Sequence, residues 1–201
     1  MIRNVVFDMG STLLEWHPIS SCLRVAGDEA DAMRLREAIF AQPWWVQQDG
    51  GLLTEEEVAQ KACEYLHDER LAAMVRPALA NLYWESLSRI PAMEGFVDEV
   101  LNAGYHVYLL SNAGVRLRDY QVLIPRVKRF DGLLVSAEEK LLKPDAAIYH
   151  RFCEKFDVRP EECFFVDDLP ENIEGARACG WQGHVFDGNV DKLRAVLFAE
   201  K

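Results

Sequence analysis

The sequence predicts an α/β protein in which helices cover both faces of a parallel sheet, and three observations support this. A short apolar run at residues 5–7 ends on Asp8, as a buried parallel strand does where it delivers a polar side chain to a loop. Strand and helix patterns alternate after Pro91, as they do along a parallel sheet. Between residues 16 and 90 helical patterns replace them, so a helical segment is expected to interrupt the sheet after its first strand.

The elements of the sheet part follow from alternating and helical spacings of apolar residues. Beyond the first strand, strands are expected at residues 105–110, 132–135, 163–166 and 183–186. Helices are expected at residues 95–103, 115–123, 145–156, 172–179 and 190–199. Parallel strands present their carboxyl ends at one edge of the sheet, and ligands bind beyond that edge.

The interruption is expected to be a small helical cap over residues 16–90, which leaves residues 1–15 and 91–201 for the core. Apolar residues recur at helical spacing in two stretches, residues 28–41 and 68–87. A third helix is expected to open at Thr54 with a capping box. Residues 43–51 place turn formers beside bulky aromatic residues, and a loop is expected there.

Composition narrows the class of protein. The chain has 201 residues, of which 50% are hydrophobic, so it can bury a sizeable core. No run approaches the roughly 18 apolar residues of a membrane span, and no signal peptide is expected before the first strand. The five cysteines form no C-x-x-C pair and are expected to be reduced. We therefore expect a cytoplasmic protein.

The charge of the chain restricts its partners. The formal net charge of −11 argues against nucleic acid or an anionic membrane as a partner, since both require a basic face. An acidic protein that handles phosphate has to supply positive charge locally, through a lysine or a metal ion. The sequence does not indicate the oligomeric state.

Polar residues stand in order at or just beyond four predicted strand ends: Asp8, Ser111-Asn112, Lys143 and Asp167-Asp168. The stretches FDMG at residues 7–10 and FVDDLPENIEGA at residues 165–176 complete the pattern. It resembles the four motifs of the haloacid dehalogenase-like (HAD) hydrolase superfamily, and in particular its small sugar-phosphate (glucose-1-phosphate) phosphatase branch. The resemblance covers nearly the whole chain and implies a Rossmann-like core with an inserted cap.

The resemblance also implies a mechanism. Asp8 would be the nucleophile and would form an aspartyl-phosphate, which divides hydrolysis into two easier displacements. Mg²⁺ would bridge nucleophile and phosphate, held by Asp8, the main-chain carbonyl of Gly10 and Asp168. Asp167 would orient these ligands without contacting the ion. A small phosphate ester is the expected substrate.

Three further residues are implied to bind the phosphoryl group. Ser111 would donate its hydroxyl and Asn112 its main-chain amide, and Lys143 would supply a positive charge and pair with Asp8. Each has a simpler interpretation when taken alone: a Ser-Asn pair after a strand is commonly a helix cap, and a Lys-Pro pair is commonly a loop. Their joint order at strand ends favours the functional interpretation.

Gly10 departs from the commoner family pattern, in which an aspartate at this position exchanges protons with the leaving group and with water. The loss puts a catalytic factor of about 10²- to 10⁴-fold at risk. The leaving group could be acidic enough to depart unaided, Glu15 or His17 could act instead, or turnover could be lost. The sugar-phosphate branch itself carries glycine here, which favours the first two alternatives.

The cap is expected to set specificity. Trp44 and Trp45 could stack on a sugar, or could simply pack within the cap, and we weigh these equally. Gln47, Gln48 and Asp49 could bind hydroxyl groups, and Trp45 and Gln48 are the candidates we select. The basic residues between positions 116 and 129 are interpreted as a solvated face rather than a second phosphate site.

The function expected from these observations is Mg²⁺-dependent hydrolysis of a small phosphate monoester, and the expected ester is a sugar phosphate. The alternatives are a 2-haloacid dehalogenase, which also uses an aspartate nucleophile, and a catalytically weak module that binds metal or phosphate. The paired carboxylates Asp167 and Asp168 argue against the dehalogenase, which needs no metal.

Overall fold

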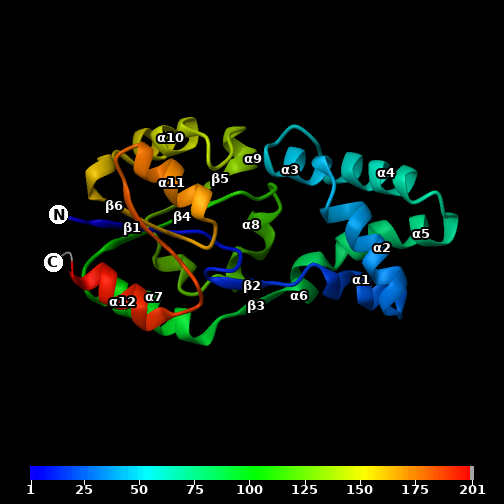
Figure 1. Ribbon diagram of the computed structural model, residues 1–201, viewed down its shortest axis with the longest axis horizontal. Coiled ribbons are helices and arrows are strands. Elements are labelled where there is room, and N and C mark those ends of the chain that lie inside the picture. Colours follow the sequence, from blue (N-terminus) through cyan, green and yellow to red (C-terminus); the bar gives the residue numbers. More distant parts are fainter. Residues whose placement is uncertain (200–201) are drawn as a thin grey trace.

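The computed structural model describes residues 1–199 and is built around a five-stranded parallel sheet (Figure 1). The strand order is β5-β4-β1-β6-β7, and all four pairings are parallel. The strands are β1 Asn4–Phe7, β4 His106–Ser111, β5 Gly132–Val135, β6 Cys163–Asp167 and β7 Gln182–Val185. The first strand is therefore central, so Asp8 emerges in the middle of the sheet edge.

Helices cover both faces of this sheet (Figure 1). One layer contains α7 Pro91–Asn102 and α12 Val190–Ala199, and the other contains α10 Ala146–Phe156 and α11 Pro170–Ala178. Alternate residues of β1 serve the two layers: Phe7 belongs to the core cluster of the first layer, and Val6 to that of the second. The predicted α/β fold class is confirmed.

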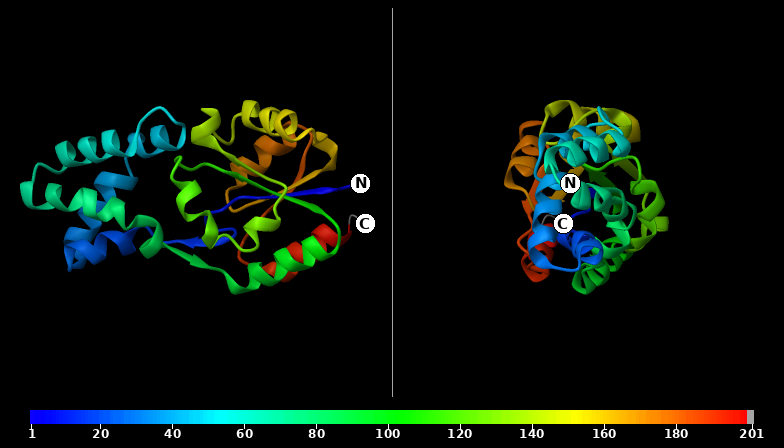
Figure 2. Two further views of the ribbon diagram at one scale, coloured as in Figure 1. Left: turned by 180° about the vertical axis from the view of Figure 1, so that it is seen from behind. Right: turned by 90° about the vertical axis from the view of Figure 1, so that its right-hand side faces the viewer.

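A separate helical lobe, inserted after the first strand, lies at the carboxyl end of the sheet, away from the N-terminus (Figures 1 and 2). It contains α1 Ile19–Ala26, α2 Glu29–Phe40, α3 Pro43–Asp49, α4 Glu55–Leu66, α5 Glu69–Ala80 and α6 Leu82–Ser86. Its two connections to the sheet domain pair as an antiparallel ribbon, β2 Leu14–Trp16 and β3 Leu87–Arg89. This lobe is the segment for which we propose the role of a cap.

Several local predictions need correction. The expected loop at residues 43–51 is mostly helix α3, which begins with a proline at its first turn, where the missing N–H costs nothing. The expected helix at 68–87 is two helices that meet at Asn81, whose side chain donates to the carbonyl of Pro77 at 2.9 Å. The helix expected at 115–123 is shortened to α8 Leu117–Tyr120 and a 3₁₀ turn.

One local prediction, the capping box of α4, is confirmed, and three elements were not predicted. The capping box of α4 is present in both directions between Thr54 and Glu57, so that prediction is confirmed. The sequence patterns did not reveal α1, the β2–β3 ribbon, or the one-turn helix α9 Ser136–Glu139. Among residues 1–199, no helix is both long and apolar enough to cross a bilayer.

Candidate active site

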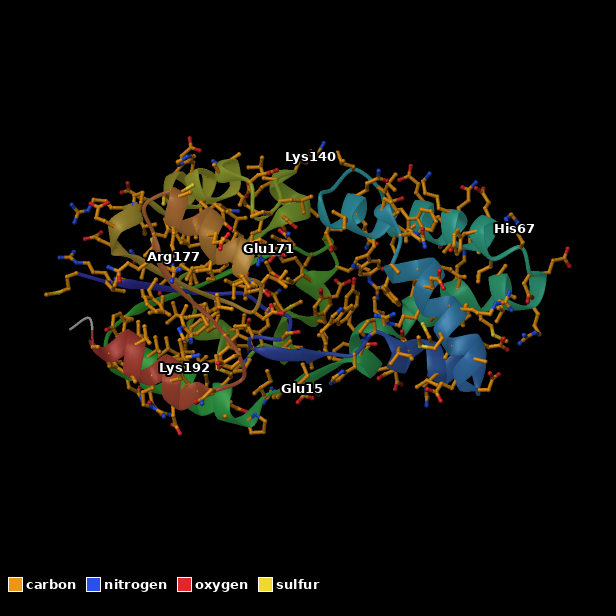
Figure 3. All side chains as sticks on the ribbon, viewed as in Figure 1. Glu15, His67, Lys140, Glu171, Arg177 and Lys192 are labelled. Carbon is orange, nitrogen blue, oxygen red and sulfur yellow. The ribbon has the colours of Figure 1, made fainter. Side chains whose placement is uncertain are left out.

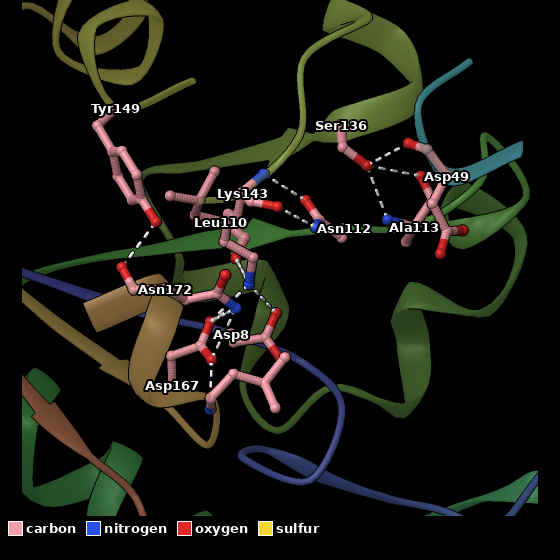
Figure 4. A network of polar contacts seen from close by, with 11 residues as sticks. Asp8, Asp49, Leu110, Asn112, Ala113, Ser136, Lys143, Tyr149, Asp167 and Asn172 are labelled. Carbon is pink, nitrogen blue, oxygen red and sulfur yellow. Dashed lines mark hydrogen bonds and ion pairs between the residues drawn. The ribbon is translucent and has the colours of Figure 1, made fainter. Parts of the chain in front are cut away.

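Asp8 lies directly after β1 and is 8% exposed. Its amide donates to the carbonyl of Val166 at 2.9 Å, which continues the pairing with β6 beyond the end of the strand. The ammonium Nζ of Lys143 donates to Asp8 Oδ1 at 2.6 Å and to Asp167 Oδ2 at 2.7 Å (Figure 4). A third bond from Nζ, to the carbonyl of Leu110 at 3.2 Å, completes the donor capacity of the lysine.

Lys143 is fixed through its main chain by Asn112. The Lys143 amide donates to Asn112 Oδ1 at 2.9 Å, and Asn112 Nδ2 donates to the Lys143 carbonyl at 3.0 Å (Figure 4). This reciprocal pair joins the loop after β4 to the loop that carries the lysine. The Asn112 side chain is thereby used for positioning, and its main-chain amide remains the group predicted to meet phosphate.

The two adjacent carboxylates after β6 have different surroundings. Asp167 is fully buried and accepts from Lys143, from the Leu169 amide at 2.8 Å and from Asn172 Nδ2 at 3.0 Å. Asp168 is partly exposed. Because the oxygens of Asp167 are already occupied, Asp168 is the carboxylate better able to accept a metal ion.

The charges of this cluster do not balance: the carboxylates of Asp8, Asp167 and Asp168 share one lysine. Burial raises the pKa of Asp8 to about 6, Lys143 opposes the shift, and Asp167 adds to it. Burial also raises the pKa of Asp168. For Lys143, burial disfavours the charged form, but the two carboxylates outweigh it and raise its pKa. A divalent cation near Asp8 and Asp168 would neutralise the excess negative charge.

The donor set fits Mg²⁺, which takes oxygen ligands from one or two carboxylates together with water and substrate. Within residues 1–199 no three His, Cys, Asp or Glu side chains converge on one metal position. A site made from Asp8, Asp168 and the carbonyl of Gly10 requires only two such side chains. The residues present therefore suit the ion that the sequence predicts.

A pocket of about 170 Å³ opens above Asp8 between the sheet edge and the helical lobe. Gly10, Ser111, Asn112 and Lys143 line it from the core side. Four aromatic residues also line it: Trp16, Trp45, Tyr83 and Tyr120. Tyr83 and Tyr120 stack with their ring centroids 3.8 Å apart. The structure thus brings together, around one cavity, predicted residues from the core and from the helical lobe: Asp8, Gly10, Ser111, Asn112, Lys143, Trp45 and Asp49. Asp168, the predicted metal ligand, is not among the residues that line it.

Comparison with known proteins identifies the family. The family model of the haloacid dehalogenase-like hydrolases matches residues 2–180. The chain belongs to this family. It is 27% identical to the sesquiterpene phosphatase astK of Aspergillus oryzae, over 92% of this chain and 90% of that protein. It is 28% identical to (S)-2-haloacid dehalogenase 4A of Burkholderia cepacia, over 90% and 80% of the two chains.

Solved structures of the family show the same fold. The HAD family enzyme bt-2542 of Bacteroides thetaiotaomicron, in complex with magnesium and inorganic phosphate, superposes with a TM-score of 0.72. The two chains are 22% identical, and the alignment covers 94% of this chain and 96% of that one. The four-motif resemblance seen in the sequence is therefore confirmed at the level of the HAD family, and the chain is a HAD-like hydrolase.

The side chains of the two adjacent tryptophans of α3 have different surroundings in this HAD hydrolase. Trp45 lines the pocket and packs edge-on against Phe40 with centroids 4.7 Å apart. Trp44 points elsewhere: its indole nitrogen donates to the Ala38 carbonyl at 3.0 Å, and its ring packs against Tyr65. Trp44 therefore packs within the lobe, whereas Trp45 both packs there and lines the pocket. Stacking of Trp45 on a sugar stays a prediction.

Gln48 does not line the active-site pocket. It is 5% exposed, and its amide nitrogen lies 2.9 Å from the point where a Cβ on Gly114 would be. The predicted role of Gln48 in substrate binding therefore has no contact with this pocket to support it. Trp16, Tyr83 and Tyr120 were not anticipated, because they come from separate segments that only the tertiary fold brings together.

Glu15 and His17 were the predicted substitutes for the missing acid, and both lie outside the pocket. Glu15 stands on β2 at the outer surface (Figure 3). It accepts a hydrogen bond from Ser88 Oγ at 2.7 Å, which lowers its pKa. His17 is 62% exposed, with Nε2 3.5 Å from Glu15. Neither is placed to protonate a group bound at Asp8.

The basic stretch after β4 is paired with acidic side chains. Arg116 Nη1 lies 2.7 Å from Glu55, and Arg118 Nε lies 2.7 Å from Glu138. Arg126 likewise pairs with Asp98 and Glu94. These ion pairs agree with the interpretation of the stretch as a solvated face rather than a second phosphate site.

Proposed function

We propose that this HAD hydrolase is a Mg²⁺-dependent phosphatase that cleaves a small phosphate monoester through an aspartyl-phosphate on Asp8. The observation that carries the proposal is the position of Asp8, at the centre of the sheet edge and facing the pocket, with Lys143 2.6 Å from one of its oxygens. That arrangement orients a carboxylate for attack on phosphorus. Lys143 also supplies positive charge beside the transferring group.

The remaining polar groups have defined tasks in this proposal. The Ser111 hydroxyl, which is nearly buried at the pocket wall, and the Asn112 amide would donate to phosphoryl oxygens. Asp8, Asp168 and the Gly10 carbonyl would hold Mg²⁺, which neutralises charge on the transferring phosphoryl group when bound. Asp167 fixes Lys143 from the far side through the 2.7 Å contact.

For the leaving group we propose a sugar or another small ring. The cavity of about 170 Å³ restricts the size of the substrate. Trp16, Trp45 and Tyr83 present aromatic surfaces around it, and such surfaces pack well against the C–H faces of a sugar ring. The cytoplasmic location and the absence of a nucleic-acid partner, both expected from the sequence, remain predictions.

The test of the function is turnover of phosphate monoesters with and without Mg²⁺, run beside 2-haloacids because a haloacid dehalogenase is among the relatives. We expect phosphate release that requires Mg²⁺ and no halide release.

Asp168→Asn should raise the Mg²⁺ concentration for half-maximal rate by more than about 100-fold, and Asp167→Asn by about 10- to 100-fold, because a ligand matters more than its orienting neighbour.

Halide release without metal would replace the phosphatase proposal with dehalogenation. Absence of both activities together with retained Mg²⁺ binding would favour a non-catalytic module. A larger effect from Asp167→Asn than from Asp168→Asn would reverse the assignment of the two carboxylates.

The aromatic wall gives a separate prediction about specificity. Trp45→Leu should lower kcat/KM for a sugar phosphate by about 10-fold or more while changing p-nitrophenyl phosphate hydrolysis much less, because Trp45 would contact only the leaving group. Trp44→Leu is the matched control, since Trp44 lies in the same helix but packs against Tyr65. Equal losses on both substrates in Trp45→Leu would assign this residue to lobe packing.

A further inference from the structure

The proposed chemistry lacks a proton donor, and one carboxyl group in the pocket has no role in the steps described so far. Gly10 carries no side chain, and Glu15 and His17 lie outside the cavity. In the described part of the chain, Asp49 is the one carboxylic acid besides Asp8 that lines this pocket. It stands at the last position of α3, so it reaches the site from the helical lobe and faces the core residues across the cavity.

Asp49 is held in place by the core. Its main-chain carbonyl accepts a hydrogen bond from Ser136 Oγ, which in turn accepts from the Ala113 amide at 2.9 Å (Figure 4). The main-chain amide of Gly114 acts on the Asp49 carboxylate and lowers its pKa. These contacts tie the end of α3 to the loop that directly follows Ser111, one of the predicted phosphate ligands.

The turn after Asp49 explains how α3 approaches so closely. Gly51 has φ +67°, and a Cβ at this position would come within 2.3 Å of the Ala137 carbonyl oxygen. Only glycine fits both the left-handed backbone conformation and this contact. The position of Asp49 is thus fixed from two sides, by Ser136 through the main chain and by the close passage of Gly51.

The surroundings of Asp49 favour its protonated form. Burial raises its pKa to about 8; the Gly114 amide lowers it, Asp8 raises it and Lys143 lowers it. Tyr83 and Tyr120 also lie within electrostatic reach, but burial raises both phenol pKa values too far for effective proton donation near neutral pH. Arg116 lies beyond them, over the Tyr83 ring, and is paired with Glu55.

We propose that Asp49 is the general acid that protonates the leaving oxygen and the general base that then activates water, an inference that rests on the proposed phosphatase function. In the first step an Asp8 oxygen bonds to phosphorus, the ester P–O bond breaks, and the Asp49 proton moves to the departing oxygen to give the free alcohol. In the second step the Asp49 carboxylate removes a proton from a water molecule while the oxygen of that water bonds to phosphorus. The P–O bond to Asp8 then breaks and releases phosphate.

The test measures release of the alcohol in a single turnover with Mg²⁺-loaded enzyme in excess, which isolates the first step. Asp49→Asn keeps the shape of the side chain and an acceptor for the Gly114 amide. It should slow release from a primary alkyl phosphate by about 10²- to 10⁴-fold. Release of p-nitrophenol from p-nitrophenyl phosphate should fall by less than about 10-fold, because that leaving group needs little protonation. Glu15→Gln is the control and should leave both rates unchanged.

The unmodified enzyme provides a second measurement that does not depend on a variant. Because the acid must be protonated, the single-turnover rate with the alkyl ester should fall as pH rises through about 8, while the rate with the aryl ester should not. Parallel losses on both esters in Asp49→Asn, or identical pH profiles for both in the parent, would overturn the role of Asp49. A parent protein that cleaves neither ester would instead contradict the phosphatase function itself.

Discussion

Asp8→Asn should reduce phosphatase turnover by at least about 10⁴-fold while leaving the fold intact. The amide preserves the size of the side chain and can still accept a hydrogen bond from Lys143, but it cannot attack phosphorus. Lys143 retains its 2.7 Å contact with Asp167, so no buried charge is left without a partner. Initial rates measured beside circular dichroism and thermal unfolding would check both parts of the expectation.

The covalent intermediate gives this prediction a direct readout. Acid quenching of the parent during turnover of a radiolabelled phosphate ester should leave an alkali-labile label on the peptide that contains residue 8, and Asp8→Asn should carry none. An Asp8→Asn protein that keeps appreciable turnover, or a label on a different peptide, would show that another group is the nucleophile.

Lys143→Met should lower the free energy of unfolding by about 3–5 kcal/mol and also abolish turnover. Its side chain is 2% exposed and is the shared counter-ion of Asp8 and Asp167. Removing one partner of a buried ion pair leaves the other charge uncompensated, and methionine fills similar space, so the loss should come from charge rather than from a cavity. Urea denaturation of parent and variant measures this difference in the free energy of unfolding.

A control at an exposed ion pair and the pH dependence distinguish the stability loss of Lys143→Met from the loss of an ordinary surface ion pair. Lys192→Met is the matched control: Lys192 Nζ lies 2.8 Å from Asp187 but is 56% exposed, so its loss should cost at most about 1 kcal/mol. Lys143 opposes the rise in the Asp8 pKa, so without it this pKa should rise further above its unfolded value. Below about pH 6 Asp8 is mostly protonated in both folded proteins, so the deficit of Lys143→Met should be small there and grow as pH rises above about 6. A deficit that is independent of pH would contradict the electrostatic explanation.

Elements marked by a clear pattern in a few consecutive residues were predicted correctly, and elements without such a pattern were missed or misassigned. Buried strands such as Cys163–Asp167 are marked by apolar runs, and the start of α4 is marked by the capping box of Thr54 and Glu57. Helix α3 was mistaken for a loop because its proline and glycines are turn formers in isolation, although a proline suits a first helical turn. The β2–β3 ribbon has no short-range signature, because its two strands lie more than 70 residues apart in the chain.

By itself the sequence determined the α/β class, the family, and the set of polar residues at the strand ends, because each depends on patterns within a few consecutive residues. Only the tertiary structure decided which residues complete the site. The sequence predicted the pairing of Lys143 with Asp8, but not the second contact of Lys143, with Asp167. Nor did it show that Trp45 lines the pocket and that Gln48 does not. Such selections depend on contacts between segments far apart in the chain. The same holds for Asp49, whose position depends on a hydrogen bond from Ser136, 87 residues away.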